Sequence, residues 1–256
     1  MRSIKYTDNR LEMVVTCVNY ADFLVETMPF NLPHIDRLVV VTSHEDTATQ
    51  ALCRKWSVEC AITDAFTEKG DTFNKGHGIN VGLGNLRQNG WILHLDADIV
   101  LPLTFRNMLD KVGLDRDILY GCERCNVTGY EQWTSIKAKF HTDPQFGYCY
   151  MMSTPETTPV GANVVHKQYG YAPIGFFQLW HSEYMHRYNL RYPDTEGSAE
   201  HMDVQWALRW PRRQRLLIPT FRVFHLETKN TSMGANWAGR TSDAFKCQKP
   251  PPPYYY

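Results

Sequence analysis

The sequence lacks any apolar run near the roughly 20 residues that a membrane-spanning helix requires. Its beginning, MRSIKYTDNRLEMVV, carries charges where a secretory signal would have its apolar stretch. It also lacks net charge, since 27 Lys and Arg balance 27 Asp and Glu. No overall field therefore draws the protein to nucleic acid or to an anionic membrane. We expect a cytoplasmic protein, unless the chain was cut from a longer one.

Cysteines are few, odd in number and irregularly spaced. There are seven, which argues against a framework of disulfides. Cys122 and Cys125 form a CxxC pair, which with His141 and Cys149 could make a zinc site. The alternative is a pair of reduced thiols on or beside a strand. The sequence leaves this choice open.

Apolar and amphipathic segments alternate along the first hundred residues. The chain has 256 residues, of which 43% are hydrophobic, enough for a globular core. Strands are predicted at 11–19, 37–42, 58–63 and 90–95, and helices at 21–30, 46–56 and 74–88. This order predicts an α/β fold, with a mostly parallel sheet flanked by helices.

The second half of the chain is less regular. Helices are predicted at 176–188 and 202–209, strands at 117–124 and 216–224, and an insertion rich in Gly, Pro and polar residues at 131–159. Residues 250–256 read as an extended Pro/Tyr tail. We therefore expect a nucleotide-binding half at 1–110 and an acceptor-binding, catalytic half of the same domain at 111–249.

Asp96 and Asp98 follow directly on the apolar segment GWILHL. In a parallel sheet, ligands bind at the carboxyl ends of the strands, where this pair would lie. Mn²⁺ and Mg²⁺ prefer hard oxygen ligands and often share them with substrate phosphates. A solvated turn is the alternative, but the flanking apolar segments favour a metal site.

The order of several motifs resembles the family 2 type of GT-A glycosyltransferases. The segments are NKGHGIN at 74–80, GWILHLDAD at 90–98 and VVTCVNYADFLVETMPF at 14–30. Later, GFFQL at 175–179 and DVQWALRW at 203–210 are similar to the acceptor half of galactosyltransferase-like members. The family's acidic turn after the second strand is replaced here by Thr42-Ser43-His44-Glu45-Asp46, which leaves the base of the nucleotide undecided.

The resemblance implies a GT-A (Rossmann-like) enzyme that moves a sugar from a nucleotide diphosphate donor, most simply a UDP-sugar, to a hydroxyl. It implies donor-binding roles for Thr16, Asn19, Asp64, Lys75, Asn80, Asp96 and Ala97. The loop at 228–240, which holds Lys229, Asn236, Trp237 and Arg240, could close over the donor, with Lys229 as a donor contact, or could be an ordinary mobile loop. It implies metal-binding roles for Asp96, Asp98 and His225. It implies acceptor-binding roles for Gly175, Phe176 and Trp180.

An inverting transferase also needs a base for the proton of the acceptor hydroxyl. The family places an acidic residue at the start of a late helix, and Asp203 directly precedes VQWALRW. Glu200 is the alternative base. An ordinary helix cap is the alternative role for Asp203, since Asp is favoured at that position.

The acceptor stays open between a saccharide or small molecule and a hydroxymethylated base in DNA, as in phage enzymes that glycosylate modified bases. The second half holds several arginines that could meet phosphates: Arg187, Arg191, Arg209, Arg212, Arg213 and Arg215. Arg212 and Arg213 are the candidate acceptor contacts among them. Arginines also decorate ordinary helix ends, so the pattern alone does not decide.

Two readings of other classes remain. A nucleotidyltransferase would also use paired aspartates and a metal, but it normally has a Gly-rich basic loop after the first strand, and residues 18–22 contain no glycine. A non-catalytic module that binds nucleotide-sugars would leave Asp98, Asp203 and His225 unexplained together. Release of UDP from a UDP-sugar with Mn²⁺ separates these readings from the transferase.

Overall fold

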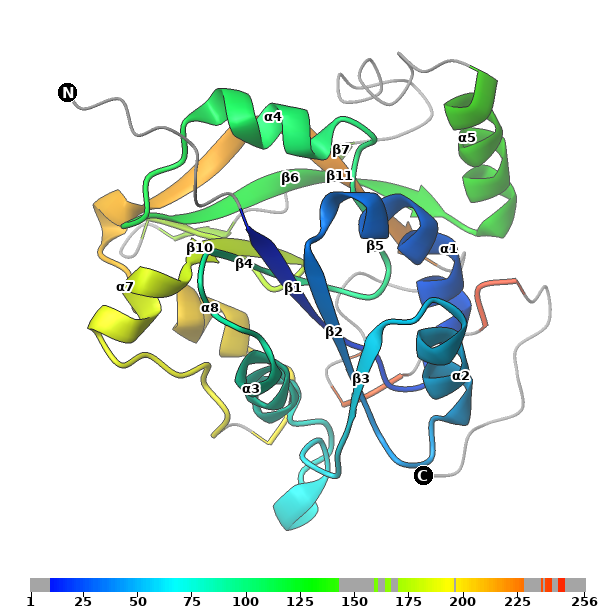
Figure 1. Cartoon of the computed structure of the whole chain (residues 1–256), viewed down its shortest axis with the longest axis horizontal. Helices are drawn as coiled ribbons and strands as arrows, with labels where there is room; N and C mark the ends of the chain where they lie inside the picture. The colour runs from blue at the N-terminus through cyan, green and yellow to red at the C-terminus, as the bar shows by residue number, and fades with distance from the viewer. Residues whose placement is uncertain are drawn as a thin grey trace.

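A nine-stranded mixed sheet forms the centre of the protein (Figure 1). The structure is a computed structural model that describes residues 10–142, 159–160, 164–166, 170–195, 197–227, 236, 238–240 and 244–246. Within these residues the strand order is β3-β2-β1-β4-β10-β6-β11-β5, with β7 paired to β6. The strands are β1 (Leu11–Thr16), β2 (Arg37–Thr42), β3 (Glu59–Ile62), β4 (Trp91–Leu95), β5 (Ile99–Val100), β6 (Leu119–Thr128), β7 (Pro159–Val160), β10 (Phe177–His181) and β11 (Arg215–Glu227), and a separate pair is formed by β8 (Val164–His166) and β9 (Gly170–Ala172).

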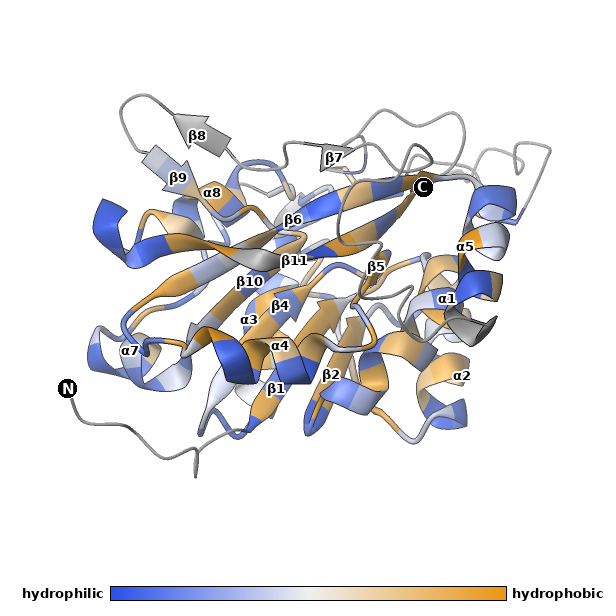
Figure 2. Cartoon of the chain, turned by 90° about the horizontal axis from the view of Figure 1, so that it is seen from above, coloured by the Kyte–Doolittle hydropathy of each residue, from blue (hydrophilic) through white to orange (hydrophobic). Residues whose placement is uncertain are grey.

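Helices cover both faces of this sheet. They are α1 (Ala21–Asn31), α2 (Thr47–Lys55), α3 (Lys75–Asn85), α4 (Phe105–Val112), α5 (Tyr130–Thr142), α7 (Ser182–Arg187) and α8 (Met202–Ala207), with single turns η1 (Leu32–His34), η2 (Glu68–Gly70) and η3 (Arg212–Gln214). Side chains alternate along a strand, so Met13 and Val15 of β1 pack in one core cluster and Val14 in another. The first cluster includes α1, α2 and α4, and the second includes α3, α7 and α8. Figure 2 shows the central strands as predominantly hydrophobic.

The prediction of an α/β fold with a mostly parallel sheet is confirmed. β3, β2, β1 and β4 run parallel, as do β6 and β11. All four strands and three helices expected in the first half are present, with bounds shifted by a few residues. Asp46 caps α2, since its side chain accepts a hydrogen bond from Thr49 N. No helix in the described part of the chain is long and apolar enough to cross a membrane.

The helix predicted at 176–188 is wrong in its first half. Residues Phe177–His181 form β10, which pairs antiparallel with both β4 and β6, and only Ser182–Arg187 are helical. Every residue of β10 is buried. A short segment buried on both faces shows no strand period, so its pattern cannot be told from that of a buried helix. The sequence reading also missed α4 and α5, the latter inside the predicted insertion.

The CxxC pair is not half of a zinc site. Cys122 and Cys125 are three positions apart on β6, so their side chains project from opposite faces of the sheet. They belong to two different hydrophobic clusters. The side chain of His141 and the whole of Cys149 lie outside the described residues. Both β6 thiols are buried core side chains.

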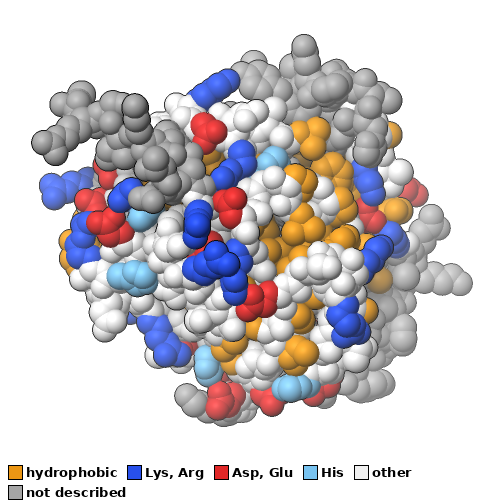
Figure 3. Space-filling model, viewed as in Figure 1, with side chains coloured by type: hydrophobic (Ala, Val, Ile, Leu, Met, Phe, Trp, Pro, Cys, Tyr) orange, Lys and Arg blue, Asp and Glu red, His pale blue; other side chains and the backbone are white. Residues whose placement is uncertain are grey.

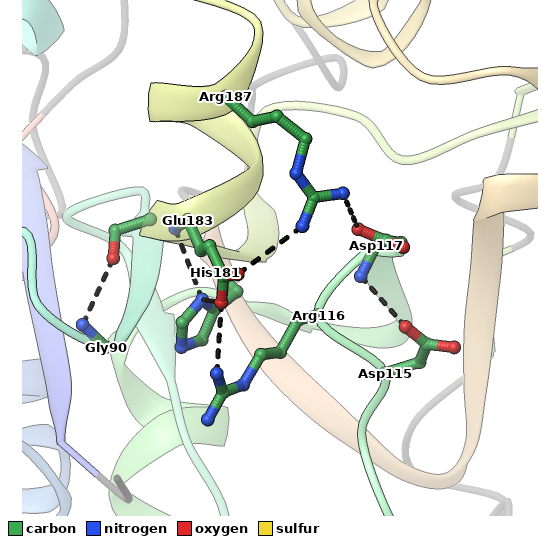
Figure 4. A network of polar contacts seen from close by, with 8 residues as sticks. Gly90, Asp115, Arg116, Asp117, His181, Glu183 and Arg187 are labelled. Atoms are coloured by element: carbon green, nitrogen blue, oxygen red, sulfur yellow. Dashed lines mark hydrogen bonds and ion pairs between the residues drawn. The ribbon is translucent and has the colours of Figure 1, made fainter.

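A network of exposed ion pairs joins α7 to the loop before β6 (Figure 4). Arg187 contacts Asp117 at 2.7 Å and Glu183 at 3.4 Å, and Arg116 contacts Glu183 at 3.0 Å. Exposed pairs of this kind contribute little to stability. Their consequence here is that the guanidinium of Arg187 already has two carboxylate partners.

The start of α3 is packed against the segment that precedes α8. Asn74 caps the helix by accepting from His77 N at 3.0 Å, and it donates to Asp194 O at 2.9 Å. A Cβ placed on Gly76 would lie 1.8 Å from Pro193 O and 2.8 Å from Met202 Sδ. Position 76 therefore requires glycine, because the backbone of α3 and the backbone at Pro193 approach each other closely there. This packing fixes the position of the neighbouring Lys75.

We predict that Gly76→Ala destabilises the fold by about 1–3 kcal/mol, because backbone atoms must move to admit the methyl group. Gly84→Ala in the same helix is the matched control, since nothing lies within 4 Å of its Cβ. It should stabilise by about 0.5–1 kcal/mol through helix propensity. Urea unfolding of both variants measures the difference, and equal effects would contradict the packing argument.

Candidate active site

A cavity of about 420 Å³ opens at the carboxyl ends of β1 and β4. Its lining includes ten of the predicted site residues, from segments far apart in the sequence: Thr16, Lys75, Asp96, Ala97, Asp98, Gly175, Phe176, Glu200, Asp203 and His225. The sheet edge thus brings the predicted metal, donor and base residues together, at the carboxyl ends of the strands, where open α/β sheets bind their ligands.

Asp98 and His225 form the part of the cavity that fits a divalent cation. Asp98 follows β4, and His225 is on β11, which pairs with β5 next to it. His225 Nε2 lies 3.3 Å from Asp98 Oδ2. Asp98 Oδ1 is buried and has no hydrogen-bond partner within the described residues, so an oxygen is left for a cation. An imidazole and a carboxylate suit Mn²⁺, and substrate phosphates commonly complete such a shell.

The protein side chains alone do not make a complete ligand set. In the described part of the chain, no group of three or more His, Cys, Asp or Glu is arranged to hold a metal ion. Burial alone would lower the pKa of His225, but Asp98 and Glu227 outweigh burial and raise its pKa to about 9. The imidazole is therefore protonated at neutral pH in this arrangement, and a cation that binds its Nε2 must displace a proton.

Lys75 and Asp96 form an ion pair at the floor of the cavity. Their side chains are 18% and 27% exposed, so water screens the pair only in part. Burial would lower the pKa of Lys75, but Asp96, with Asp203 and Asp98 beyond it, raises it. The ammonium is therefore charged and lies among three carboxylates. Behind Asp96, burial lowers the pKa of His94 to about 3, so that imidazole is neutral.

Asp203 is the predicted base, and the backbone holds its carboxylate. Asp203 Oδ2 accepts a hydrogen bond from Gly175 N at 2.7 Å, and Oδ1 accepts from Val204 N at 2.7 Å. A Cβ on Gly175 would lie 3.1 Å from Asp203 Cβ. The glycine thus lets the loop before β10 approach the first turn of α8, and two backbone N–H groups hold the carboxylate.

A buried polar network connects Asp203 to α3. Gln178 Nε2 donates to Asp203 O at 3.0 Å, and its Oε1 accepts from Tyr192 OH at 2.9 Å. Asn80 in turn donates to Tyr192 O at 2.8 Å and accepts from Tyr192 N at 3.0 Å. Asn80, predicted to bind the donor, therefore does not line the cavity. It holds the segment that carries Tyr192, which does.

A C-terminal segment forms another wall of the cavity and is anchored on α1. Arg240 donates to both oxygens of Asp22, at 2.5 and 2.8 Å, and to Asn19 O at 2.6 Å. Its guanidinium lies 4.7 Å from the centre of the Tyr20 ring. Asn236 donates to the Tyr20 hydroxyl. Asn19 lies outside the lining, and its positive φ of 58° turns the chain between β1 and α1.

Glu26, one turn after Asp22, is a second anchor for the same segment. Its buried carboxylate contacts Lys246 at 2.8 Å and Lys137 of α5 at 2.9 Å, and it accepts from Trp133 Nε1 at 3.0 Å. Burial would raise the pKa of Glu26, but these partners outweigh burial and hold it below its ordinary value. The charge on Glu26 thus stabilises the folded chain.

Several predicted site residues lie elsewhere. Asp64 lies two residues after the end of β3 with a side chain that is 75% exposed, and it does not line the cavity. Trp180 is fully buried in β10 among core side chains, because that strand is central in the sheet. Arg212 and Arg213 are exposed on η3 and do not line the cavity. Lys229 lies outside the described residues.

The sequence analysis missed other residues of the cavity wall, above all Arg124, Tyr192 and Glu227. Arg124 is on β6, and its guanidinium lies 4.8 Å from the centre of the Phe176 ring. Glu227 is two positions after His225, a spacing that puts both on one face of a strand. That spacing is the signal that could have found it.

Comparison with solved structures identifies the architecture. Glucosyl-3-phosphoglycerate synthase from Mycobacterium tuberculosis, solved with Mn²⁺ and UDP-glucose, superposes with a TM-score of 0.50 at 12% identity, over 88% of this chain and 72% of that chain. Mannosyl-3-phosphoglycerate synthase from Rubrobacter xylanophilus gives a TM-score of 0.45 at 15% identity, over 88% and 68%. The chain has the GT-A glycosyltransferase fold.

This likeness confirms the predicted fold and, at 12% identity, shows the fold alone. A scan against family models gives no match, and a search of curated proteins gives no significant match.

We predict that Glu26→Gln destabilises the protein by about 1–3 kcal/mol near pH 7, the range for a hydrogen-bonded charged group. Because the folded-state pKa is lowered, this stabilisation is complete above the ordinary value of about 4.3 and is lost as the pH falls through the folded pKa. The free energies of unfolding of parent and variant, measured from pH 7 to pH 3, should therefore converge in acid. Glu45→Gln, an exposed control, should leave stability unchanged. A pH-independent difference would contradict the assignment.

Proposed function

We propose that the chain is a metal-dependent, inverting glycosyltransferase that moves a sugar from a UDP-sugar to a hydroxyl acceptor. The observation that carries the proposal is the convergence of Lys75, Asp96, Asp98, Asp203 and His225 on one cavity of a GT-A fold. The similar Mycobacterium enzyme was solved with Mn²⁺ and UDP-glucose, which supports this class of donor and metal.

In this proposal Asp98 and His225 would hold Mn²⁺ or Mg²⁺. When bound, the ion would supply positive charge against the diphosphate leaving group. Lys75 supplies a second positive charge from the floor of the cavity, where it now balances Asp96. Thr16 and Ala97 also line the cavity and would face the donor.

Asp203 would accept the proton of the acceptor hydroxyl. As that proton leaves, the oxygen forms a bond to the anomeric carbon, and the bond from that carbon to the diphosphate oxygen breaks with its electron pair. Hydrogen bonds from Gly175 N and Val204 N hold the carboxylate in place for this step. Attack from the face opposite the leaving group inverts the anomeric carbon.

The acceptor favoured by the cavity is a saccharide or another small hydroxyl compound. Phe73, Ile174, Phe176, Tyr192 and Met202 give its wall an aromatic and apolar character that suits the face of a sugar ring. Among the described residues, the exposed Arg209, Arg212 and Arg213 do not line the cavity. Arg187 and Arg191 are paired with carboxylates, and Arg215 is buried. On the face seen in Figure 3, basic and acidic side chains are interspersed.

We predict that the parent releases UDP slowly from UDP-sugars with Mn²⁺, and that EDTA abolishes this release reversibly. Asp98→Asn should also abolish it with the fold intact, because an amide is a poor ligand for a hard dication. Asp110→Asn, an exposed carboxylate on α4, is the control and should retain full activity. Full turnover in excess chelator would refute the metal requirement.

We predict further that Asp203→Asn lowers kcat at least about a hundredfold while the affinity for UDP stays nearly constant, since the carboxylate faces the acceptor. Glu200→Gln should have a much smaller effect. Steady-state kinetics with the best acceptor found measure kcat, and calorimetry measures the affinity for UDP. An active Asp203→Asn enzyme beside an inactive Glu200→Gln enzyme would show that Glu200 is the base.

A further inference from the structure

His225, Glu227 and Asn126 form a row of polar side chains beside the proposed cation site. His225 and Glu227 are two positions apart on β11, so they share one face of the sheet. Asn126 is the register partner of His225 on the neighbouring strand β6. His225 Nδ1 lies 3.0 Å from Glu227 Oε1, and Asn126 Nδ2 donates to that same oxygen at 3.2 Å.

The two nitrogens of the His225 ring therefore face different carboxylates. Nε2 lies 3.3 Å from Asp98 Oδ2 on the cavity side, and Nδ1 faces Glu227. The side chains of His225 and Glu227 are each only 11% exposed, so the contact is little screened by water. Nδ1 makes no hydrogen bond within the described residues, so its contact with Glu227 Oε1 is electrostatic in this conformation.

We propose that Glu227, held by Asn126, is a positioning residue that orients His225 and keeps the proton on Nδ1, so that Nε2 is presented to a divalent cation. The inference rests on the metal site of the proposed function. It adds a carboxylate–imidazole–cation arrangement in which Glu227 acts through His225.

The physical reason is the choice between two tautomers. A neutral imidazole can bind a cation only through the nitrogen that carries no proton. A carboxylate beside Nδ1 favours the proton there and leaves the lone pair of Nε2 directed toward Asp98. A carboxylate that contacts the far nitrogen of a metal-binding histidine typically changes metal affinity by roughly 10- to 100-fold.

Direct coordination by Glu227 is the competing role, because Glu227 also lines the cavity. The two roles differ in one measurable respect. If Glu227 acts through His225, its replacement has no further effect on cation affinity once His225 has been removed. If Glu227 is a direct ligand, its replacement still weakens cation binding in the absence of His225. A double-mutant cycle therefore distinguishes them.

The experiment is a titration of the purified full chain with Mn²⁺ in the presence of saturating UDP, whose diphosphate would complete the ligand set. Free Mn²⁺ is followed by electron paramagnetic resonance, and a protein-free sample of Mn²⁺ and UDP is the blank. The variants are Glu227→Gln, His225→Ala and the double variant. Glu123→Gln is the matched control, since Glu123 pairs with Arg222 at 2.7 Å on the same two strands and does not line the cavity. Thermal unfolding confirms that each variant is folded, and the visible spectrum of bound Co²⁺ reports the histidine ligand.

We expect Glu227→Gln to weaken Mn²⁺ binding roughly 10- to 100-fold and to alter the Co²⁺ spectrum. The double variant should bind Mn²⁺ no more weakly than His225→Ala, and Glu123→Gln should match the parent. Unchanged binding in Glu227→Gln, with binding weakened in His225→Ala, overturns the inference and leaves the metal site standing. A double variant weaker than His225→Ala shows direct coordination and also overturns it. A parent that does not bind, or an unaffected His225→Ala, refutes the metal site and the inference together.

Discussion

The ion pair between Lys75 and Asp96 is the contact around which the cavity is organised. Asp96, Asp98 and Asp203 contribute three carboxylates to a small, partly buried space, where their mutual repulsion is poorly screened. In the metal-free protein, the ammonium of Lys75 offsets part of that repulsion. The same concentration of carboxylates is what gives the cavity its affinity for a cation.

Much of the surrounding structure keeps Lys75 and Asp203 in place. The cap by Asn74 and the close approach at Gly76 fix the first turn of α3, and Asn80 ties α3 to the segment carrying Tyr192. Gln178 then connects Tyr192 to the backbone of Asp203. The proposed base is therefore positioned by buried polar contacts that begin on the same helix as the lysine. A second set of contacts, from Asp22 and Glu26 of α1, holds the C-terminal wall.

The first half of the fold could be predicted because its signals are local. Apolar strands of ordinary length that alternate with helices predict a parallel sheet. The polar residues that follow the strands mark the carboxyl edge of that sheet, where Asp96 and Asp98 lie. β10 could not be predicted in this way, because a central strand buried on both faces loses its period. Donor roles for Asn19 and Asn80 were inferred from resemblance in order. In the structure Asn19 lies in a turn that contacts Arg240, and Asn80 contacts the segment at Tyr192; neither contact can be predicted locally, because the partners are distant in the sequence. Glu227 was missed for the same reason, since its partner Asn126 lies on a neighbouring strand.

The central claim is that Asp98 and His225 hold the cation that meets the donor diphosphate. A crystal grown with Mn²⁺ and UDP, with diffraction recorded at the manganese absorption edge, tests it most directly. The account predicts one strong anomalous peak in contact with Asp98, His225 Nε2 and oxygens of the UDP diphosphate. Two results would contradict it: UDP bound in the cavity with the manganese peak elsewhere, or UDP bound in the cavity with Asp98 and His225 still in direct contact with each other.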